Sequence, residues 1–159
     1  MKNVRSVFVL AVILIIAGLI LTLENTGFIK GASKLWPLFP LAAGGGFLLL
    51  YFEYKRTDIA LLFLGTVLIL LSVFFLFLNY TAWSLTATLW PLFLGIAGAG
   101  FLPMYFSSRV RLFLFLAIGL ILLAGVFYLV FGVSLALWPL SLVAFGASLL
   151  FVNHYYLKR

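Results

Sequence analysis

The sequence contains no cysteine, one histidine and three acidic residues in 159 positions. Without cysteine, the chain can form neither a disulfide nor a thiolate metal site. The acids are Glu24, Glu53 and Asp58, and all three fall at the ends of apolar stretches. Ion-coupled transport normally needs an ionisable group inside the membrane, and the predicted spans hold none. We therefore expect no catalytic residue, no metal, no cofactor and no enzyme activity.

Apolar residues are in large excess: they fill 67% of positions, only 8% are charged, and the mean hydropathy is +1.34. These values are far outside the range of soluble domains. Between Arg5 and Glu24 lie 18 uncharged residues, which is the length of one spanning helix. The same reasoning predicts an all-α integral membrane protein whose six transmembrane helices cover about 6–23, 35–52, 59–79, 89–106, 112–131 and 135–153.

An internal repeat organises these spans. A Leu-Trp-Pro-Leu motif occurs three times, and its second and third copies follow at offsets of 54 and 48 positions. At the offset of 54, Gly18 aligns with Ser72, and Asn25 aligns with Asn79. We interpret the chain as a single membrane domain, 1–159, built from three copies of one two-helix hairpin at 5–56, 57–109 and 110–159.

The third copy has a shorter outer loop, because Gly125 and Gly132 take the places of Ser72 and Asn79 at an offset of 53. Each unit holds an even number of spans, so the copies are parallel in the membrane. We therefore expect three hairpins related by a pseudo-threefold axis along the membrane normal. Span one aligns with the internal span three, so we interpret it as a membrane helix rather than a cleaved signal peptide.

Lysine and arginine are distributed unevenly. The tails and the two inner loops hold eight of the ten, whereas the opposite loops hold Lys30 and Lys34. Because cytoplasmic loops carry the excess of lysine and arginine, we expect a multi-pass protein with both termini in the cytoplasm. The net charge of +7 is then a topology signal. The lipid bilayer is the expected partner, and nucleic acid is not, because no basic surface domain exists to bind it.

The three Trp-Pro pairs fall at the start of spans two, four and six. Proline lacks an N–H and suits the first position of a helix, and tryptophan favours the interface between membrane and water. We interpret the pairs as interface anchors at the outer surface, with an outward-facing docking ring of three tryptophans as the alternative. The residues are Trp36, Pro37, Trp90, Pro91, Trp138 and Pro139.

A triplet of small residues follows each Trp-Pro pair. In lipid the hydrophobic drive between helices is weak, so close backbone approach through small residues is a main source of association. We expect the triplets to pack the three hairpins together near the middle of the membrane, with binding of another protein's helix as the alternative. The predicted helix-packing glycines are Gly18, Gly44, Gly46, Gly98, Gly100, Gly125 and Gly146.

Glu24 and Asn25 form the most suggestive polar pair, at the outer end of span one, and Asn79 is the equivalent of Asn25 in repeat two. Such an outer polar site can bind a cationic ligand. A helix end at the membrane interface explains the same residues about as well, so both interpretations stay open.

Each hairpin combines an apolar helix with an inner glycine, an asparagine near its outer end, the Leu-Trp-Pro-Leu motif and a glycine-rich second helix. These features lie at Gly18, Asn25, Gly27, Trp36, Pro37 and Gly44, then at Asn79, Trp90, Pro91 and Gly98, and then at Trp138, Pro139 and Gly146. The pattern resembles the hairpin of the LiaI-LiaF-like transmembrane family of bacterial envelope-stress proteins. Repeat three lacks the asparagine, and this sequence holds no counterpart of the soluble C-terminal domain of LiaF-type proteins.

The resemblance implies a protein of the bacterial cytoplasmic (inner) membrane, without catalysis, that senses or modulates a response to cell-envelope damage. Two classes of function fit. The first is a non-enzymatic scaffold or regulator whose helices contact another membrane protein. The second is a small channel, or a carrier for lipid or apolar solute, along the pseudo-threefold axis. Because polar residues are scarce inside the membrane, the sequence favours the first class and leaves homo-oligomer formation open.

Overall fold

The computed structural model describes residues 15, 18–19, 21–27, 31–53 and 58–156. Most of the predicted first span, the basic tails and the inner loop at 54–57 lie outside the described residues. The chain divides into two compact units, Met1–Trp36 and Pro37–Arg159, and each is described by itself.

The first unit is helical at residues 21–25 and includes the 3-10 helix η1 (Ala32–Leu35). Between these two segments, Gly27 and Gly31 adopt φ angles of +83° and +89°, in the left-handed region that glycine occupies at no steric cost. The N–H of Gly27 donates to the carbonyl oxygen of Glu24 at 2.9 Å. The backbone itself therefore closes the turn that follows the first predicted span.

The second unit contains the long helices of the described chain. Their residues are apolar nearly throughout, and a backbone in apolar surroundings must pair its own N–H and C=O groups, which a helix does. The long helices are α2 (Leu38–Glu53), α3 (Ile59–Tyr80), α5 (Leu92–Ser108), α6 (Arg111–Gly132) and α7 (Pro139–Tyr156). Shorter elements join them: η2 (Trp83–Leu85) and α4 (Thr86–Leu89) between α3 and α5, and η3 (Leu135–Leu137) between α6 and α7.

Polar residues mark the ends of these helices. Before α3, Oδ1 of Asp58 accepts the N–H of Ala60 at 3.0 Å and caps the first turn. After α5, Arg109 adopts a left-handed φ of 57°, and its N–H donates to the carbonyl oxygen of Tyr105 at 2.8 Å. Arg109 and Val110 alone then connect α5 to α6. A connection this short makes the two helices antiparallel neighbours.

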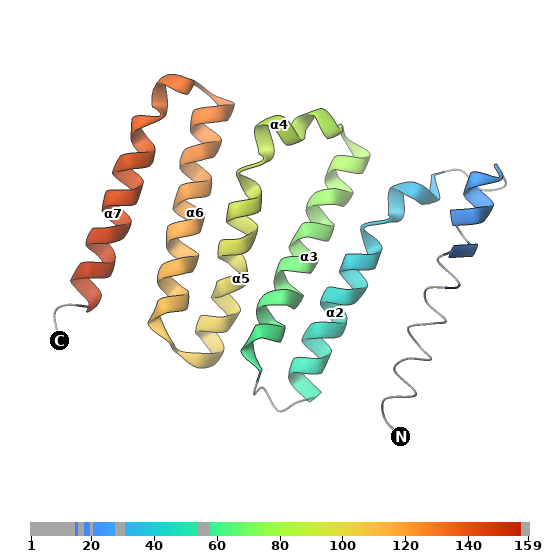
Figure 1. The fold of residues 1–159 in the computed structure, drawn as a ribbon, viewed down its shortest axis with the longest axis horizontal. Helices are drawn as coiled ribbons and strands as arrows, with labels where there is room; N and C mark the ends of the chain where they lie inside the picture. The colour runs from blue at the N-terminus through green and yellow to red at the C-terminus, as the bar shows by residue number, and fades with distance from the viewer. Residues whose placement is uncertain (1–14, 16–17, 20, 28–30, 54–57, 157–159) are drawn as a thin grey trace. The chain divides into compact units, whose positions relative to one another are not determined.

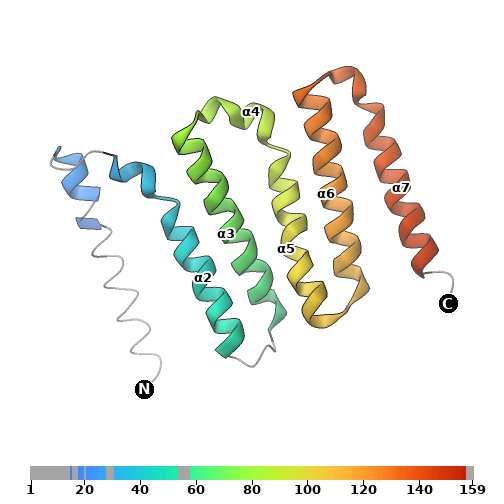
Figure 2. The same ribbon diagram turned by 180° about the vertical axis from the view of Figure 1, so that it is seen from behind.

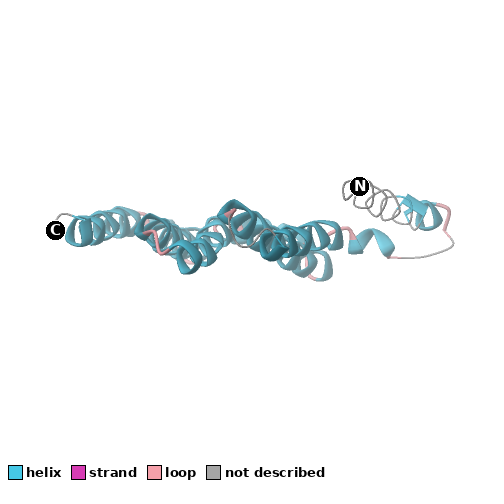
Figure 3. Cartoon of the chain, turned by 90° about the horizontal axis from the view of Figure 1, so that it is seen from below, coloured by secondary structure: helices cyan, strands magenta, loops and turns pink. Residues whose placement is uncertain are grey.

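Within the second unit, the long helices lie side by side in chain order (Figure 1), and the view from behind gives the same succession (Figure 2). α2 packs on α3, α3 on α5, α5 on α6, and α6 on α7. Seen from below, these helices form a single layer (Figure 3). The segment Trp83–Leu89 is bent by 71° from α5 and lies across one end of α3 and α5.

The contacts of the second unit do not show the pseudo-threefold arrangement expected from the sequence, in which the third hairpin also packs against the first. In the described part of the second unit, the substantial contacts join neighbours in the row, and α2 and α7 lie at its opposite ends. The small triplet of α5 accounts for the row. Its first and third positions, Gly98 and Gly100, point about 200° apart on the helix, so α5 is held between α6 and α3 on opposite sides. Contacts of this kind extend a row and do not curve around an axis.

Two described helices, α3 and α6, are long and apolar enough to cross a membrane, and each has 22 residues. The bent pair Trp83–Leu89 and Leu92–Ser108 is a third candidate if it is one broken span. At 1.5 Å per residue, 22 residues extend about 33 Å, which matches the hydrocarbon core of a bilayer. Only 28% of the most apolar part of α3 and 17% of that of α6 is buried inside the protein. The all-α class is confirmed, and the outward-facing apolar helices indicate embedding in a membrane.

Candidate functional site

Gly44 and Gly65 bring the backbones of α2 and α3 into contact. A Cβ atom at Gly44 would lie 2.8 Å from the carbonyl oxygen of Gly65 and 2.9 Å from Cγ1 of Ile69. A Cβ atom at Gly65 would lie 2.9 Å from the carbonyl oxygen of Gly44 and 2.7 Å from Cδ2 of Leu48. The helices can approach this closely because neither residue has a side chain. Since α2 belongs to the predicted repeat one and α3 to repeat two, this contact joins two repeats.

Gly98 makes the equivalent contact between α5 and α6. A Cβ atom at Gly98 would lie 3.0 Å from the carbonyl oxygen of Ala117 and 3.0 Å from Cγ1 of Ile121. One turn earlier, a Cβ atom at Gly95 would lie 3.5 Å from Cβ of Ala124. α5 belongs to repeat two and α6 to repeat three. The first position of the triplet therefore joins consecutive repeats a second time.

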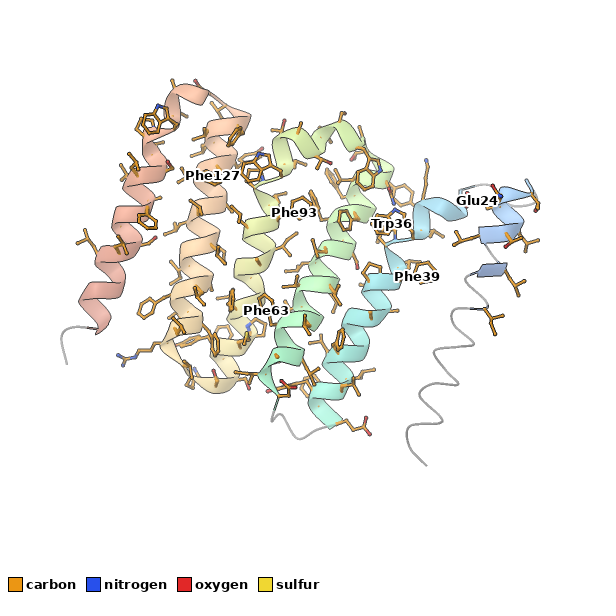
Figure 4. The ribbon with its side chains drawn as sticks, in the orientation of Figure 1. Glu24, Trp36, Phe39, Phe63, Phe93 and Phe127 are labelled. Carbon is orange, nitrogen blue, oxygen red and sulfur yellow. The ribbon has the colours of Figure 1, made fainter. Side chains whose placement is uncertain are left out.

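Gly100, at the third position of the triplet, faces the other neighbour of α5. A Cβ atom there would lie 2.5 Å from Cγ2 of Val67 and 3.0 Å from the ring of Phe63, both on α3. Further along the same two helices, Phe93 packs edge-on against Phe74 with ring centroids 5.1 Å apart. Figure 4 labels Phe63 and Phe93 near this contact. The third position thus packs the two helices of one repeat together, whereas the first position packs consecutive repeats.

Four of the predicted packing glycines are open. A Cβ atom at Gly18, Gly46, Gly125 or Gly146 would meet no atom within 4 Å. Gly46 is the repeat-one equivalent of Gly100, and Gly146 is the repeat-three equivalent of Gly98. Gly98 and Gly100 therefore contact neighbouring helices, whereas their equivalents Gly146 and Gly46 have open space where a side chain would be.

The contacts on α6 follow a different register from the one predicted. Gly65 corresponds in its contacts to Ala117, and Ile69 corresponds to Ile121, which is an offset of 52 instead of 53. Ser72 and Ala124 are buried, whereas Gly125 is exposed. Sequence reasoning aligned glycine with glycine and missed Ala117 and Ala124. The pattern of isoleucine followed three residues later by a small residue, at Ile69/Ser72 and Ile121/Ala124, could have found them.

The Trp-Pro pair of repeat two is part of the contact between α5 and α6. Pro91 is almost fully buried, with an exposed fraction below 2%. The ring centroid of Trp90 lies 5.1 Å from that of Phe131 and 5.5 Å from that of Phe127, which Figure 4 labels. In this repeat the tryptophan packs against the first helix of the next repeat.

The other two Trp-Pro pairs differ from each other. Pro37, which directly precedes α2, is also buried below 2%, and Trp36 at the end of the first unit is 37% exposed. In repeat three, Trp138 is 59% exposed and Pro139 is exposed as well. The prolines of the first two pairs are therefore buried, whereas both residues of the third pair are exposed.

The residues of the predicted outer polar site make local contacts. In the first unit, Oε1 of Glu24 accepts the N–H of Gly31 at 2.8 Å, and Asn25 is exposed; Figure 4 labels Glu24. In the second unit, Oδ1 of Asn79 accepts the indole N–H of Trp83 at 2.9 Å. These contacts support the interpretation of Glu24 and Asn79 as residues that hold the ends of helices.

One polar contact has no signal in the sequence. The side chain of Tyr51 is 3% exposed, and its hydroxyl shares a hydrogen bond of 2.5 Å with the hydroxyl of Ser107. Tyr51 lies on α2 and Ser107 on α5, so this bond reaches past α3 and ties two repeats together. No pattern in the sequence connects Tyr51 with a serine 56 positions away.

The described residues hold no group of three or more histidine, cysteine, aspartate or glutamate side chains that could bind a metal ion. Comparisons with protein-family models, with curated proteins and with solved structures found no match. The family resemblance stays a prediction from the sequence. The candidate functional site is therefore the set of small-residue contacts between repeats, together with the helix faces that remain open.

Proposed function

We propose that the protein is a non-enzymatic scaffold or regulator that contacts other membrane proteins through the outward faces of its helices. The observation that carries this proposal is the division of α3 and α6 into two kinds of face. Small residues such as Gly65 and Ala117 face neighbouring helices, whereas larger apolar residues such as Val73 and Leu122 face outward. Outward apolar faces on a packed helical layer are suited to contact with lipid and with other membrane helices.

The hydroxyl groups argue against the channel or carrier alternative. A path for solutes through a membrane protein needs polar groups that are available to line it. The hydroxyls of Thr22 and Ser72 instead donate to the carbonyl oxygens of Gly18 and Leu68, each at 2.7 Å and each four residues back. Serine and threonine in helices commonly bond back to their own backbone in this way. Solute flux into liposomes that contain the purified protein would overturn the scaffold proposal.

The topology that accompanies this proposal has six spans and both termini in the cytoplasm. In this topology α2 and α7 are spans in addition to α3, α5 and α6. With 16 and 18 residues, they extend about 24 and 27 Å. The end of the layer that carries Arg109 and Arg111 faces the cytoplasm under the positive-inside rule. A single cysteine at Ser84 should react with an impermeant thiol reagent from outside, and one at Thr57 should not. The reverse labelling pattern overturns the orientation.

The role in an envelope-stress response rests on the resemblance to the LiaI-LiaF-like family. We test it with photoreactive phenylalanine analogues at Val73 and Leu122, in native membranes, with and without an inhibitor of cell-wall synthesis. The same analogue at Phe93, which packs on Phe74 and Phe75, is the control and should give internal products only. A defined protein partner whose yield changes with the inhibitor supports the regulatory role. Exclusively lipid and internal products under both conditions contradict it.

A further inference from the structure

One face of α7 is uncovered. We define the open α7 face by Pro139, Val143, Gly146 and Leu150, whose spacings of three and four residues place them on one side of a helix. Val143 is 65% exposed and Leu150 is 70% exposed. A Cβ atom at Gly146 would meet nothing within 4 Å. This face combines a central glycine with flanking apolar side chains.

The equivalent faces of α2 and α5 are covered by a neighbouring helix. Their residues are Pro37, Leu41, Gly44 and Leu48 on α2, and Pro91, Gly95, Gly98 and Leu102 on α5. Both prolines are less than 2% exposed, and both Gly44 and Gly98 are buried. In each case the covering element is the first helix of the next repeat, α3 or α6. The open α7 face is therefore a third copy of an interface that the chain already forms twice.

The covering helices share a pattern. Ile69 of α3 lies against Gly44, and Ile121 of α6 lies against Gly98. Three residues later, each helix has a buried small residue, Ser72 in α3 and Ala124 in α6, with exposed fractions of 0% and 6%. An isoleucine and a small residue one turn later thus form the complementary half of the interface.

The first predicted span carries the same pattern at Ile15 and Gly18, 54 positions before Ile69 and Ser72. Ile15 is 61% exposed, and a Cβ atom at Gly18 would meet nothing within 4 Å. The first unit therefore leaves its copy of one half of the interface uncovered, and the second unit leaves the other half uncovered on α7.

We propose that the open α7 face binds the first span of a second copy of this chain, so that copies associate head to tail. α3, α5 and α6 lie between α2 and α7 in the row (Figure 1), and the first span leads into α2 along the chain. The chain's own first span is tethered through residues 24–37 to α2, at the opposite end of this row from α7, whereas the first span of a second copy carries no such tether. The interface is heterologous, because the two copies contribute different surfaces. This proposal does not depend on the regulatory role.

Disulfide crosslinking in native membranes tests this proposal, and the cysteine-free chain gives no background. The internal reference is the double variant Gly95→Cys/Ala124→Cys, whose Cβ atoms lie 3.5 Å apart, within the range of disulfides. The repeat-equivalent pair between copies is Val143→Cys in one copy and Gly18→Cys in another, each with its own tag. We expect oxidation to yield a mixed dimer that carries both tags, while each single variant expressed alone stays monomeric.

Three outcomes overturn the proposal. In the first, the internal reference pair closes but no mixed dimer forms. In the second, Val143→Cys alone yields a dimer, which indicates that α7 pairs with α7 of another copy. In the third, the double variant Gly18→Cys/Val143→Cys closes within a single chain, which indicates a threefold ring.

A packing variant checks that the crosslink reports this face. Gly146→Leu should lower the yield of the mixed dimer about tenfold, because leucine occupies the space that the second copy needs. Ala147→Leu is the matched control, since its side chain points about 100° away around the helix, and the yield should not change. Equal yields for the two variants contradict docking at Gly146.

Discussion

α5 and α7 are the second helices of two repeats, yet they differ in how much of their surface is covered. α5 packs on α6 through Gly98 and on α3 through Gly100, whereas α7 packs on α6 and leaves Gly146 uncovered. Both helices follow a Leu-Trp-Pro-Leu motif and contain a small triplet. The difference lies in the neighbouring helices, because α6 covers Gly98 and no described helix covers Gly146. A small-residue face is therefore only a potential contact until a neighbouring helix covers it.

Gly98→Leu should have the largest effect on stability of the variants that test this difference between α5 and α7. Even a lone Cβ atom at Gly98 lies 3.0 Å from the carbonyl oxygen of Ala117, so leucine would force α5 and α6 apart. We expect a loss of about 3 kcal/mol of stability. Gly146→Leu, at the uncovered equivalent position, should leave the monomer unchanged. Thermal melts of the two variants in detergent measure the effect, and equal melting temperatures would contradict tight packing at Gly98.

Trp90→Ala and Trp138→Ala extend the comparison to the aromatic anchors. Trp90 packs on Phe127 and Phe131, and two aromatic contacts of this kind contribute about 2 kcal/mol in total. Trp138 is exposed, so its removal should change the melting temperature in detergent little. If both tryptophans act through the membrane interface alone, the two variants will lose equal stability in detergent.

Gly44→Ala and Gly45→Ala sharpen the comparison within one triplet. A methyl group at Gly44 would lie 2.8 Å from the carbonyl oxygen of Gly65, so we expect a loss of about 1 kcal/mol. A methyl group at Gly45 meets nothing within 4 Å and should be tolerated. Unfolding followed by tryptophan fluorescence distinguishes the variants, and the packing argument fails if Gly45→Ala is the more damaging.

Arg109→Gly should have the smallest effect, and it acts on the turn that aligns α5 with α6. Arginine at a φ of 57° is strained, and glycine adopts this conformation freely, so we expect a gain of about 0.5 kcal/mol. Arg111→Gly removes the same charge from a helical position, where glycine is unfavourable, and should not stabilise the protein. Stabilisation by both variants would assign the effect to charge and not to backbone strain.

The all-α class and the membrane character followed from the sequence because continuous apolar runs admit few other structures. The importance of the small triplets also followed from their recurrence, and Gly44, Gly98 and Gly100 do lie at helix contacts. The arrangement of the helices in a row could not be predicted from the sequence. Which neighbour a helix face contacts depends on the register of both helices. The offset of 52 on α6 illustrates this point. Ala117 and Ala124 are the small residues that pack against α5, whereas the alignment of glycines predicted Gly125.

Glu24 and Asn79 illustrate a second limit. Their position at the ends of spans was visible in the sequence, but their partners, Gly31 and Trp83, were not. A carboxylate or amide near a membrane surface can bind a ligand or close a turn, and the same residue type serves both purposes. Only the geometry of the loop distinguishes the two.

Because the first and third positions of the α5 triplet contact opposite neighbours, the layer is an approximately one-dimensional array, in which most contacts join nearest neighbours and the Tyr51–Ser107 bond reaches one helix further. In such an array, each helix of the second unit can pack on its predecessor without waiting for the C-terminal part of the chain. Gene duplication or loss of one hairpin would change the width of the array by two helices and leave the remaining contacts in place. A membrane protein built in this way can grow without redesign of its existing interfaces.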